Sequence, residues 1–250
     1  MTPGAITEAV EILRESRARG PTLDAFPETC RPTALAEAHA IQAATACRLG
    51  EAIGGWKVGA TPDGGVARGA LLRSRIYESG AHVPAAIVPL LGVEAEIAFR
   101  FEHGLPPRGR VYTYDEVADA VVALPAIEIV DSRFRGYPKA PLLDRVADCM
   151  SNGAFVYGGA IRDWRSRRLA EADAELTFDE QTIVRRTGGH PTKDPLLPAV
   201  ALVNDLRGEG GVEAGQIVTT GTYTGLNHAK RGQTVVATFH GVGSVRVIFE

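Results

Sequence analysis

The spacing of apolar residues changes near Gly54, and this change constrains the fold more than any other feature of the chain. Before Gly54, apolar residues recur at helical spacing in two stretches. The first ends at Gly20, and the second follows Thr33, which we expect to cap its helix, and ends at Gly50. After Gly54, short apolar runs are separated by Gly, Pro and Asp. A helical part followed by a mainly β part predicts an α+β fold, with a helical region over residues 1–53 and a β-rich catalytic domain over residues 54–250.

The second part is expected to consist of strands with a few inserted helices. Thr113 and Glu116 form a capping box that opens a helix, which we expect Pro125 to end. Further helices are expected over residues 142–150 and from Asp194-Pro195 to Gly208. The expected strands cover residues 55–59, 92–101, 126–130, 154–161, 174–178, 182–186, 216–220, 234–239 and 244–249.

Charge and composition exclude several classes of protein. The 250 residues carry a net charge of −3 and no basic block, so nucleic acid is not an expected partner. No stretch approaches the roughly 20 consecutive apolar residues of a membrane span, and residues 1–20 lack the apolar core of a signal peptide. The three cysteines are widely spaced and odd in number, which favours a reducing compartment. We therefore expect a soluble, cytoplasmic protein.

Two acidic residues in one expected strand are the first candidates for chemistry. In Glu94-Ala95-Glu96 the side chains two residues apart point to the same face of a strand. Carboxylates that lie this close repel each other unless a cation or a proton lies between them, and a hard divalent cation such as Mg²⁺ suits them. The alternative is a solvated strand face.

Glu128 and Lys57 each interrupt an apolar run. A carboxylate at Glu128 is costly to bury unless it is paired, protonated or bound to a metal. The structural alternative is an ion pair with Arg133, and Asp131 is an alternative acid. Lys57, between Trp56 and Val58, is suited to act as a proton donor or acceptor or to bind a carboxylate. The structural alternative is an exposed strand lysine.

A turn rich in hydroxyl groups follows the expected strand at residues 216–220. Residues 219–225 combine four threonines with two glycines, and such a turn can hold a substrate carboxylate through hydroxyl and backbone N–H groups. The alternative is an ordinary polar turn. The six histidines show no metal-ligand spacing, and no nucleophile elbow, phosphate loop or dinucleotide fingerprint occurs.

Taken in order, five segments resemble the fumarylacetoacetate hydrolase superfamily, and within it the branch of 2-keto-4-pentenoate hydratases and 4-oxalocrotonate decarboxylases. Each segment is modest alone, but their shared order and spacing along nearly the whole chain are specific for the superfamily. The segments cover residues 55–61, 93–99, 125–133, 147–153 and 214–222 with Gly225.

The resemblance implies a mixed β-sheet roll with a helical N-terminal region, and it implies a role for each candidate. Glu94, Glu96 and Glu128 match the carboxylate ligands of a Mg²⁺ or Mn²⁺ ion, and Lys57 matches a lysine of the hydratase active site. Two residues match the substrate-binding parts of relatives, namely Ser151 and, in the turn near the substrate carboxylate, Thr222.

The implied chemistry is that of a Mg²⁺-dependent lyase in aromatic catabolism. The ion binds the carboxylate and 2-oxo oxygens of a small keto acid and stabilises an enolate. Hydration of a 2-hydroxydienoate such as 2-keto-4-pentenoate is the expected outcome. The same enolate serves two alternatives, decarboxylation of a 4-oxalocrotonate-type acid and C–C hydrolysis of an acylpyruvate. The resemblance also implies a homo-oligomer, or a complex with a related pathway enzyme.

One segment departs from the family pattern. Hydratases of this branch carry an acidic residue in a Pro-Asp-Phe-Gly-like segment after the lysine, and here that stretch is shortened, with Asp63 as the candidate replacement. This departure leaves a second class of function open, a non-catalytic partner subunit or keto-acid binder. A plain structural oligomer is a further alternative, and it predicts no affinity for divalent metal.

Overall fold

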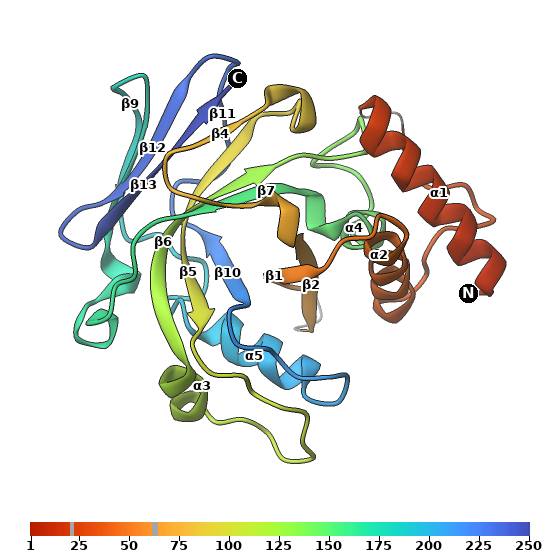
Figure 1. Ribbon diagram of the computed structural model, residues 1–250, viewed down its shortest axis with the longest axis horizontal. Helices are drawn as coiled ribbons and strands as arrows, with labels where there is room; N and C mark the ends of the chain where they lie inside the picture. Colours follow the sequence, from red (N-terminus) through yellow and green to blue (C-terminus); the bar gives the residue numbers. More distant parts are fainter. Residues whose placement is uncertain (21–22, 62–64) are drawn as a thin grey trace.

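Two β-sheets and a helical region at one side form the molecule in this computed structural model, which describes residues 1–20, 23–61 and 65–250. In Figure 1 the N-terminal helices α1 and α2 lie to one side of the sheets, and α3 and α5 lie at the opposite end of the β part from the C-terminus. The helices are α1 (Pro3–Arg19), α2 (Leu35–Arg48), α3 (Tyr114–Ala120), α4 (Leu142–Ala147) and α5 (Leu197–Leu206).

The larger sheet holds the strands that matter for the site. Its order is β2 (Val66–Leu72), β1 (Ile53–Ala60), β10 (Ile217–Thr222), β5 (Gly92–Phe101), β6 (Val121–Val130), β7 (Asn152–Tyr157) and β3 (Ile76–Glu78), with β11 (Asn227–His228) paired to β5. Strands β1 and β10 are parallel, whereas β5 pairs antiparallel with both β10 and β6. The smaller sheet has the order β4 (Ala81–Val83), β13 (Gly243–Phe249), β12 (Thr234–Phe239), β8 (Asp173–Phe178) and β9 (Gln181–Thr187). This mixed pairing confirms the expected α+β fold.

Side chains of both sheets make up the main core. One face of β5 contributes Val93, Ala95, Ile97 and Phe99, all fully buried, and the smaller sheet contributes residues such as Val235 and Phe239. The strict alternation along β5 therefore turns its other face, with Glu94 and Glu96, away from this core.

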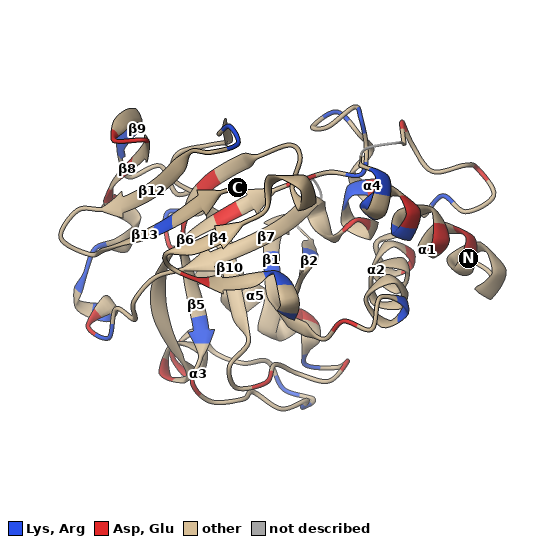
Figure 2. Ribbon diagram, turned by 45° about the horizontal axis from the view of Figure 1, so that its top comes forward, with Lys and Arg blue, Asp and Glu red and all other residues tan. Residues whose placement is uncertain are grey.

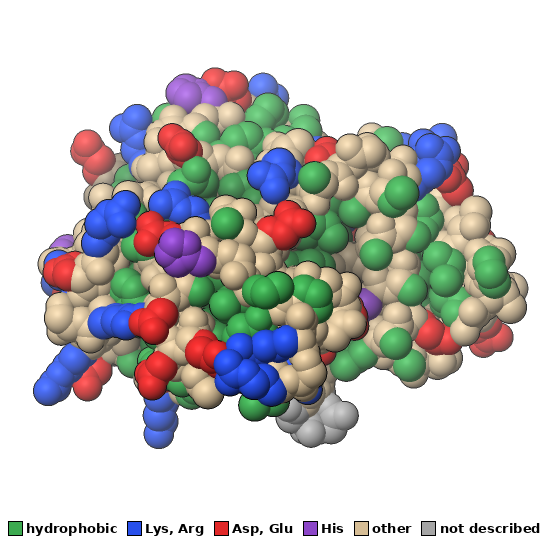
Figure 3. Space-filling view, turned by 60° about the horizontal axis from the view of Figure 1, so that its bottom comes forward, with side chains coloured by type: hydrophobic (Ala, Val, Ile, Leu, Met, Phe, Trp, Pro, Cys, Tyr) green, Lys and Arg blue, Asp and Glu red, His purple; other side chains and the backbone are tan. Residues whose placement is uncertain are grey.

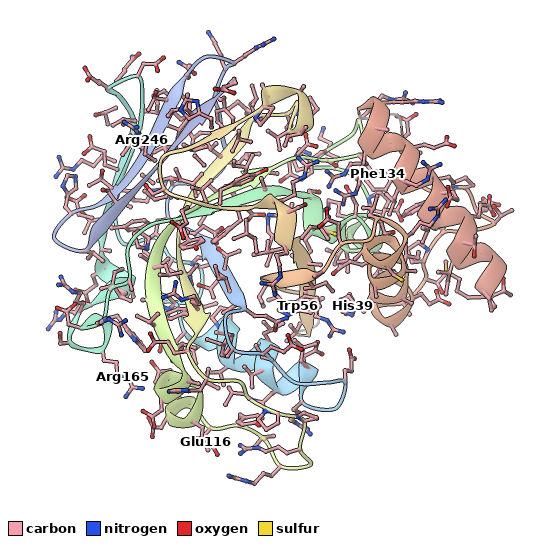
Figure 4. The ribbon with its side chains drawn as sticks, viewed as in Figure 1. His39, Trp56, Glu116, Phe134, Arg165 and Arg246 are labelled. Carbon is pink, nitrogen blue, oxygen red and sulfur yellow. The ribbon has the colours of Figure 1, made fainter. Side chains whose placement is uncertain are left out.

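The N-terminal helices have their own hydrophobic cluster, which also includes residues of the β part. Ala9, Leu13 and Ile41 pack with residues of α4 and with Ala67 of β2. Figure 3 shows the surface hollowed between these helices and the β body. In Figure 4, His39 of α2 and Trp56 of β1 lie near each other in this region, and both line a cavity of about 420 Å³.

Helix α1, the capping box of α3 and strand β5 were predicted correctly, but four helix ends differ from the expectation. The N-cap of α2 is Ala34 rather than Thr33, whose backbone N–H and hydroxyl both bind Glu37. Helix α3 ends at Ala120, and Pro125 lies inside strand β6 because residues 121–124 are buried and paired with β5. Helix α5 begins at Leu197 rather than at Asp194-Pro195. Helix α4 ends at Ala147 rather than at residue 150, because the backbone of Asp148 leaves the helical conformation.

Charged residues of both signs are interspersed over the ribbon in Figure 2. None of the helices in the described part of the chain has the length and apolar character that a bilayer crossing requires.

Candidate metal centre and substrate cavity

The three glutamates predicted as metal ligands meet on one face of the larger sheet. Glu94 and Glu96 share that face because they are two residues apart on β5, and the antiparallel register sets Glu94 directly opposite Glu128 of β6. Each of the three offers a carboxylate oxygen, and these oxygens all lie within 4.8 Å of one another. The strand register thus brings together carboxylates that are far apart in the sequence.

Neighbouring polar groups hold two of these carboxylates in place. Asn152 Nδ2 donates a hydrogen bond to Glu128 Oε1 at 3.1 Å. The hydroxyl of Thr219 and the backbone N–H of Gly221 both donate to Glu96 Oε2, the latter at 3.1 Å. Such partners orient a carboxylate before a metal ion arrives.

The proposed alternative for Glu128, an ion pair with Arg133, is not formed. Arg133 instead binds Asp148 at 2.6 Å and Asp131 at 3.1 Å. Asp131, the alternative acid, is therefore occupied in a separate buried network. Glu128 is fully buried, and its Oε2 forms an ion pair with Lys57.

Lys57 lies on strand β1, which is separated from β5 by β10, and its side chain reaches the glutamates. Its Nζ lies 2.9 Å from Glu128 Oε2 and 3.8 Å from Glu94 Oε2. The side chain is only 16% exposed, so the alternative of an exposed strand lysine is wrong. Burial lowers the pKa of Lys57, but the charges of Glu128, Glu94 and Glu96 outweigh it and raise the pKa above its ordinary value.

The pKa values of two of the carboxyl groups are raised as well. Burial raises the pKa of Glu94, with Lys57 opposing the shift and Glu128 adding to it. Burial and then the charges of Glu128 and Glu94 raise the pKa of Glu96 to about 8. Burial is the largest cause of both shifts, and repulsion between neighbouring carboxylates adds to it.

The residues present fit a hard divalent cation. Three carboxylates against one lysine leave a net charge of −2 when all four groups are ionised, which is the charge that one Mg²⁺ or Mn²⁺ ion compensates. The ligand atoms are all oxygens, as these ions prefer. The oxygen Glu128 Oε2 lies 2.9 Å from Lys57 Nζ, so a cation that binds this oxygen competes with the ammonium group.

A cavity of about 520 Å³ opens beside the glutamates. Near its polar end lie Lys57, Glu94, Glu96 and Thr222. The remaining wall is mostly apolar and is formed by β1, the start of β2, the turn before β7 and helix α5. Its residues include Val58, Val66, Met150, Pro191, Leu197, Pro198 and Ala201. This arrangement suits a molecule with one polar, anion-bearing end and one apolar end.

Thr222 and Ser151, the two predicted substrate-binding residues, lie in different surroundings. Thr222 pairs with Glu96 in the β10–β5 register and lines the cavity, and its hydroxyl accepts hydrogen bonds from the N–H groups of Thr224 and Gly225. Ser151 is fully buried, its hydroxyl has no hydrogen-bond partner within the described ranges, and it does not line the cavity. Asp63 lies outside the described residues.

Several residues that support the site have no role predicted from the sequence. Asn152 follows Ser151 directly, within the segment 147–153 that carries part of the family resemblance. Thr219 and Gly221 belong to the threonine-rich turn. No sequence signal singles out Tyr137 or the residues of α5 that line the cavity, because only the fold brings them there.

The chain is similar to known proteins in sequence and in structure. No protein-family model matches the chain. Over 95% of its length, the chain is 32% identical to a 2-keto-4-pentenoate hydratase of Burkholderia vietnamiensis, of which it covers 94%. It is 30% identical over 96% of its length to a 2-hydroxyhexa-2,4-dienoate hydratase of Comamonas testosteroni, again covering 94%.

Among solved structures, the fold matches a 4-oxalocrotonate decarboxylase from Pseudomonas putida G7, complexed with magnesium and adipate, with a TM-score of 0.86. That match has 21% identity and covers 100% of this chain and 99% of the other. Fold and sequence thus define a member of the fumarylacetoacetate hydrolase superfamily. Within it, the chain belongs to the branch of 2-keto-4-pentenoate hydratases and 4-oxalocrotonate decarboxylases.

Proposed function

We propose that the protein is a divalent-metal-dependent hydratase that adds water to a 2-hydroxydienoate, or its 2-keto form, such as 2-keto-4-pentenoate. The observation that carries this proposal is the convergence of three carboxylates and Lys57, of which Lys57, Glu94 and Glu96 line a largely apolar cavity. The names of the hydratase relatives, which align with nearly the whole chain, support it.

Glu94, Glu96 and Glu128 would hold the ion, Mg²⁺ or Mn²⁺. When bound there, such an ion supplies Lewis-acid stabilisation of the negative charge that develops on a 2-oxo oxygen. Asn152, Thr219 and the Gly221 N–H keep the carboxylates oriented, which reduces the rearrangement that binding requires. The turn that contains Thr222 is proposed to face the substrate carboxylate.

Lys57 is proposed as the residue that moves the proton. Its raised pKa keeps the ammonium group charged at neutral pH in the metal-free site, so it is ready to donate a proton or to hold developing negative charge. The apolar wall around it limits access of bulk water, and charge stabilisation is stronger in such surroundings. Hydration then requires one ordered water as the nucleophile. Lys57 and solvent donate and accept the protons that this addition moves.

The cavity wall favours the hydratase over the decarboxylase. Lys57 is the one cationic side chain among the described residues that line the cavity, and residues 62–64 are Pro, Asp and Gly, which carry no positive charge. A second carboxylate on the substrate would therefore lie against apolar residues such as Pro198 and Ala201 without a positive partner in the described wall. A dienoate with a hydrocarbon tail needs no such partner.

A direct assay tests the proposal. The chelator-treated protein is given Mg²⁺ together with 2-hydroxypenta-2,4-dienoate, 4-oxalocrotonate or an acylpyruvate. We expect Mg²⁺-dependent hydration of the dienoate with the highest kcat/KM. Faster decarboxylation or C–C hydrolysis would assign the site to one of the alternatives. Pyruvate or oxalate binding without any turnover would identify a non-catalytic keto-acid binder or partner subunit.

The cellular setting is proposed from the same relatives. The names of the relatives support a small keto acid or dienoate of aromatic catabolism as the substrate. A homo-oligomer in the cytoplasm is a further part of the proposal. The decarboxylase relative of Pseudomonas putida suggests a related pathway enzyme as a candidate partner. Light scattering after size-exclusion chromatography measures the oligomeric state.

A further inference from the structure

A second cavity, of about 340 Å³, is lined by four arginines and shares no lining residue with the substrate cavity. It lies where the end of α1, the turn after β2, the loop after β4 and the end of β6 meet. Arg17 and Arg19 come from α1, Arg75 from the turn after β2, and Arg133 from the segment after β6.

The acidic groups near this cavity do not balance the arginines. Asp131 binds Arg133 at 3.1 Å and also accepts the backbone N–H of Leu90. Glu51 accepts the hydroxyl of Ser74 at 2.6 Å. Both acidic side chains that line the cavity are thus already engaged.

Asp148, behind the cavity wall, is also engaged. It binds Arg133 at 2.6 Å and Arg17 at 3.3 Å. Within the described ranges, no acidic group forms an ion pair with Arg19 or Arg75. Residues 21–22, which follow the end of α1 directly, are Pro and Thr and add no negative charge. Four arginines against three carboxylates leave this region with excess positive charge.

Two guanidinium nitrogens are left without a partner. Arg17 Nε and Arg75 Nη1 are buried, and neither donates a hydrogen bond to a described residue. A buried donor without an acceptor is costly, and the cost is greater for a charged group. Burial and the nearby charges of Arg133 and Arg75 lower the pKa of Arg17, with Asp148 and Cys149 opposing the shift. These two nitrogens therefore lack an acceptor among the described residues.

We propose that this cavity is a binding site for a small oxyanion, a phosphate or carboxylate group, held by Arg17 and Arg75. Guanidinium groups present paired N–H donors whose geometry matches the oxygens of carboxylates and phosphates. The volume is sufficient for an ion of this size. The site is separate from the proposed catalytic function and does not depend on it.

Arg73 provides a matched control. It lies on the same short turn as Arg75, spanning Arg73–Arg75, but it is exposed and does not line the arginine cavity. Replacing either arginine by glutamine removes the same charge from the chain. Only Arg75→Gln removes a donor from the cavity.

The test is calorimetric titration of the full-length, metal-free protein with inorganic phosphate and, separately, with succinate, at an ionic strength held constant with chloride. Removal of metal prevents anion binding at the glutamate site. We expect one saturable site per chain for at least one of the two anions, and a rise in unfolding temperature that saturates with it. Arg75→Gln should weaken the affinity about tenfold or more, and Arg73→Gln should leave it unchanged.

The choice of anion identifies the chemistry: tighter binding of phosphate assigns a phosphate site, and tighter binding of succinate assigns a carboxylate site. If Arg75→Gln does not fold, Arg75→Lys replaces it, because it keeps the charge but loses the paired donors, and the affinity should still fall. The proposal is overturned if neither anion shows saturable binding, or if both glutamine variants weaken binding equally.

Discussion

Single side chains decide whether the glutamate cluster can bind a metal ion. Glu94 and Glu96 form a set of three carboxylates only because Glu128 lies opposite on the neighbouring strand. Glu128 is tolerated in the interior because Lys57 and Asn152 contact it. Removing one member should therefore affect metal binding more than it affects the fold.

Glu128→Gln keeps the shape of the side chain but removes the charge and one strong ligand oxygen. We expect the affinity for Mg²⁺, measured by calorimetry on chelator-treated protein, to fall more than the roughly tenfold that loss of a supporting contact costs. Glu28→Gln, at an exposed position, is the control and should bind as wild type does. Equal affinity in Glu128→Gln and wild type would remove Glu128 from the ligand set.

Lys57→Met separates proton transfer from metal binding. Loss of a positioned acid or base typically costs on the order of 10²–10⁴-fold in rate, so kcat for hydration should fall in that range. The affinity for Mg²⁺ should be kept or should increase, because an ammonium group 2.9 Å from Glu128 competes with the cation. A variant with wild-type kcat would exclude Lys57 from the chemistry.

At this scale the sequence predicts part of the site. The period of two along a strand places Glu94 and Glu96 on one face without any further information. Glu128 and Lys57 were recognised as polar residues in apolar runs, but their meeting with the pair depends on strand register, which composition does not reveal. The contact of Asn152 with Glu128 could not be foreseen from its neighbours, and the roles of Ser151 and Thr222 in substrate binding stay predictions.

Strands and turns position these side chains. Local helix propensity alone gives a wrong prediction at the junction of α3 and β6. The capping box at Thr113 and Glu116 was predicted correctly, yet the helix stops before Pro125 because residues 121–124 pair with β5. Tertiary pairing with a neighbouring strand overrides the continuation of a helical pattern there. The resulting ten-residue strand β6 places Glu128 opposite Glu94.

Close approach of β2 to the turn before β7 gives a prediction at the scale of elements. A Cβ at Gly69 would lie 2.4 Å from the carbonyl oxygen of Cys149. Because backbone atoms cannot move aside cheaply, Gly69→Ala should lower the free energy of unfolding by about 1–3 kcal/mol, measured by denaturant titration. Gly208→Ala, where a Cβ meets nothing within 4 Å, is the matched control. Similar stability of the two variants would contradict this packing.

For the whole molecule, the order of a helical region followed by mixed sheets was evident from the change of periodicity near Gly54. The short strands β3, β4 and β11 were not predicted, since two or three residues are too few to show a period. Strand β2 was also not predicted, because nearly all of its residues are buried and its sequence shows no alternation of polar and apolar residues. The division into a region over residues 1–53 and a domain over residues 54–250 stays a prediction, as does the oligomeric state.

Stability of the metal-free protein should depend on pH through Glu96. Its pKa is raised from an ordinary value of 4.5 to about 8, so between these values the folded state binds a proton more tightly than the unfolded state does. This contribution to stability is present at low pH and is lost as pH rises towards 8. Mg²⁺ binds the ionised form, so the rise in unfolding temperature caused by Mg²⁺ should grow from pH 5 to pH 8.

Scanning calorimetry with and without Mg²⁺ at several pH values measures this effect. Glu96→Gln, which cannot titrate at this position, should show a weaker dependence of the Mg²⁺-induced shift on pH. A shift that is constant over this range in the wild-type protein, or larger at pH 5, would contradict the assignment of Glu96 as a ligand that gives up a proton.

The position of the bound ion is the most direct measure of the central claim. Crystals grown with Mn²⁺ and measured at a wavelength where manganese scatters anomalously would show where the ion lies. The account predicts one strong anomalous peak among the carboxylates of Glu94, Glu96 and Glu128. A peak only at other residues, or none at saturating Mn²⁺, would contradict it.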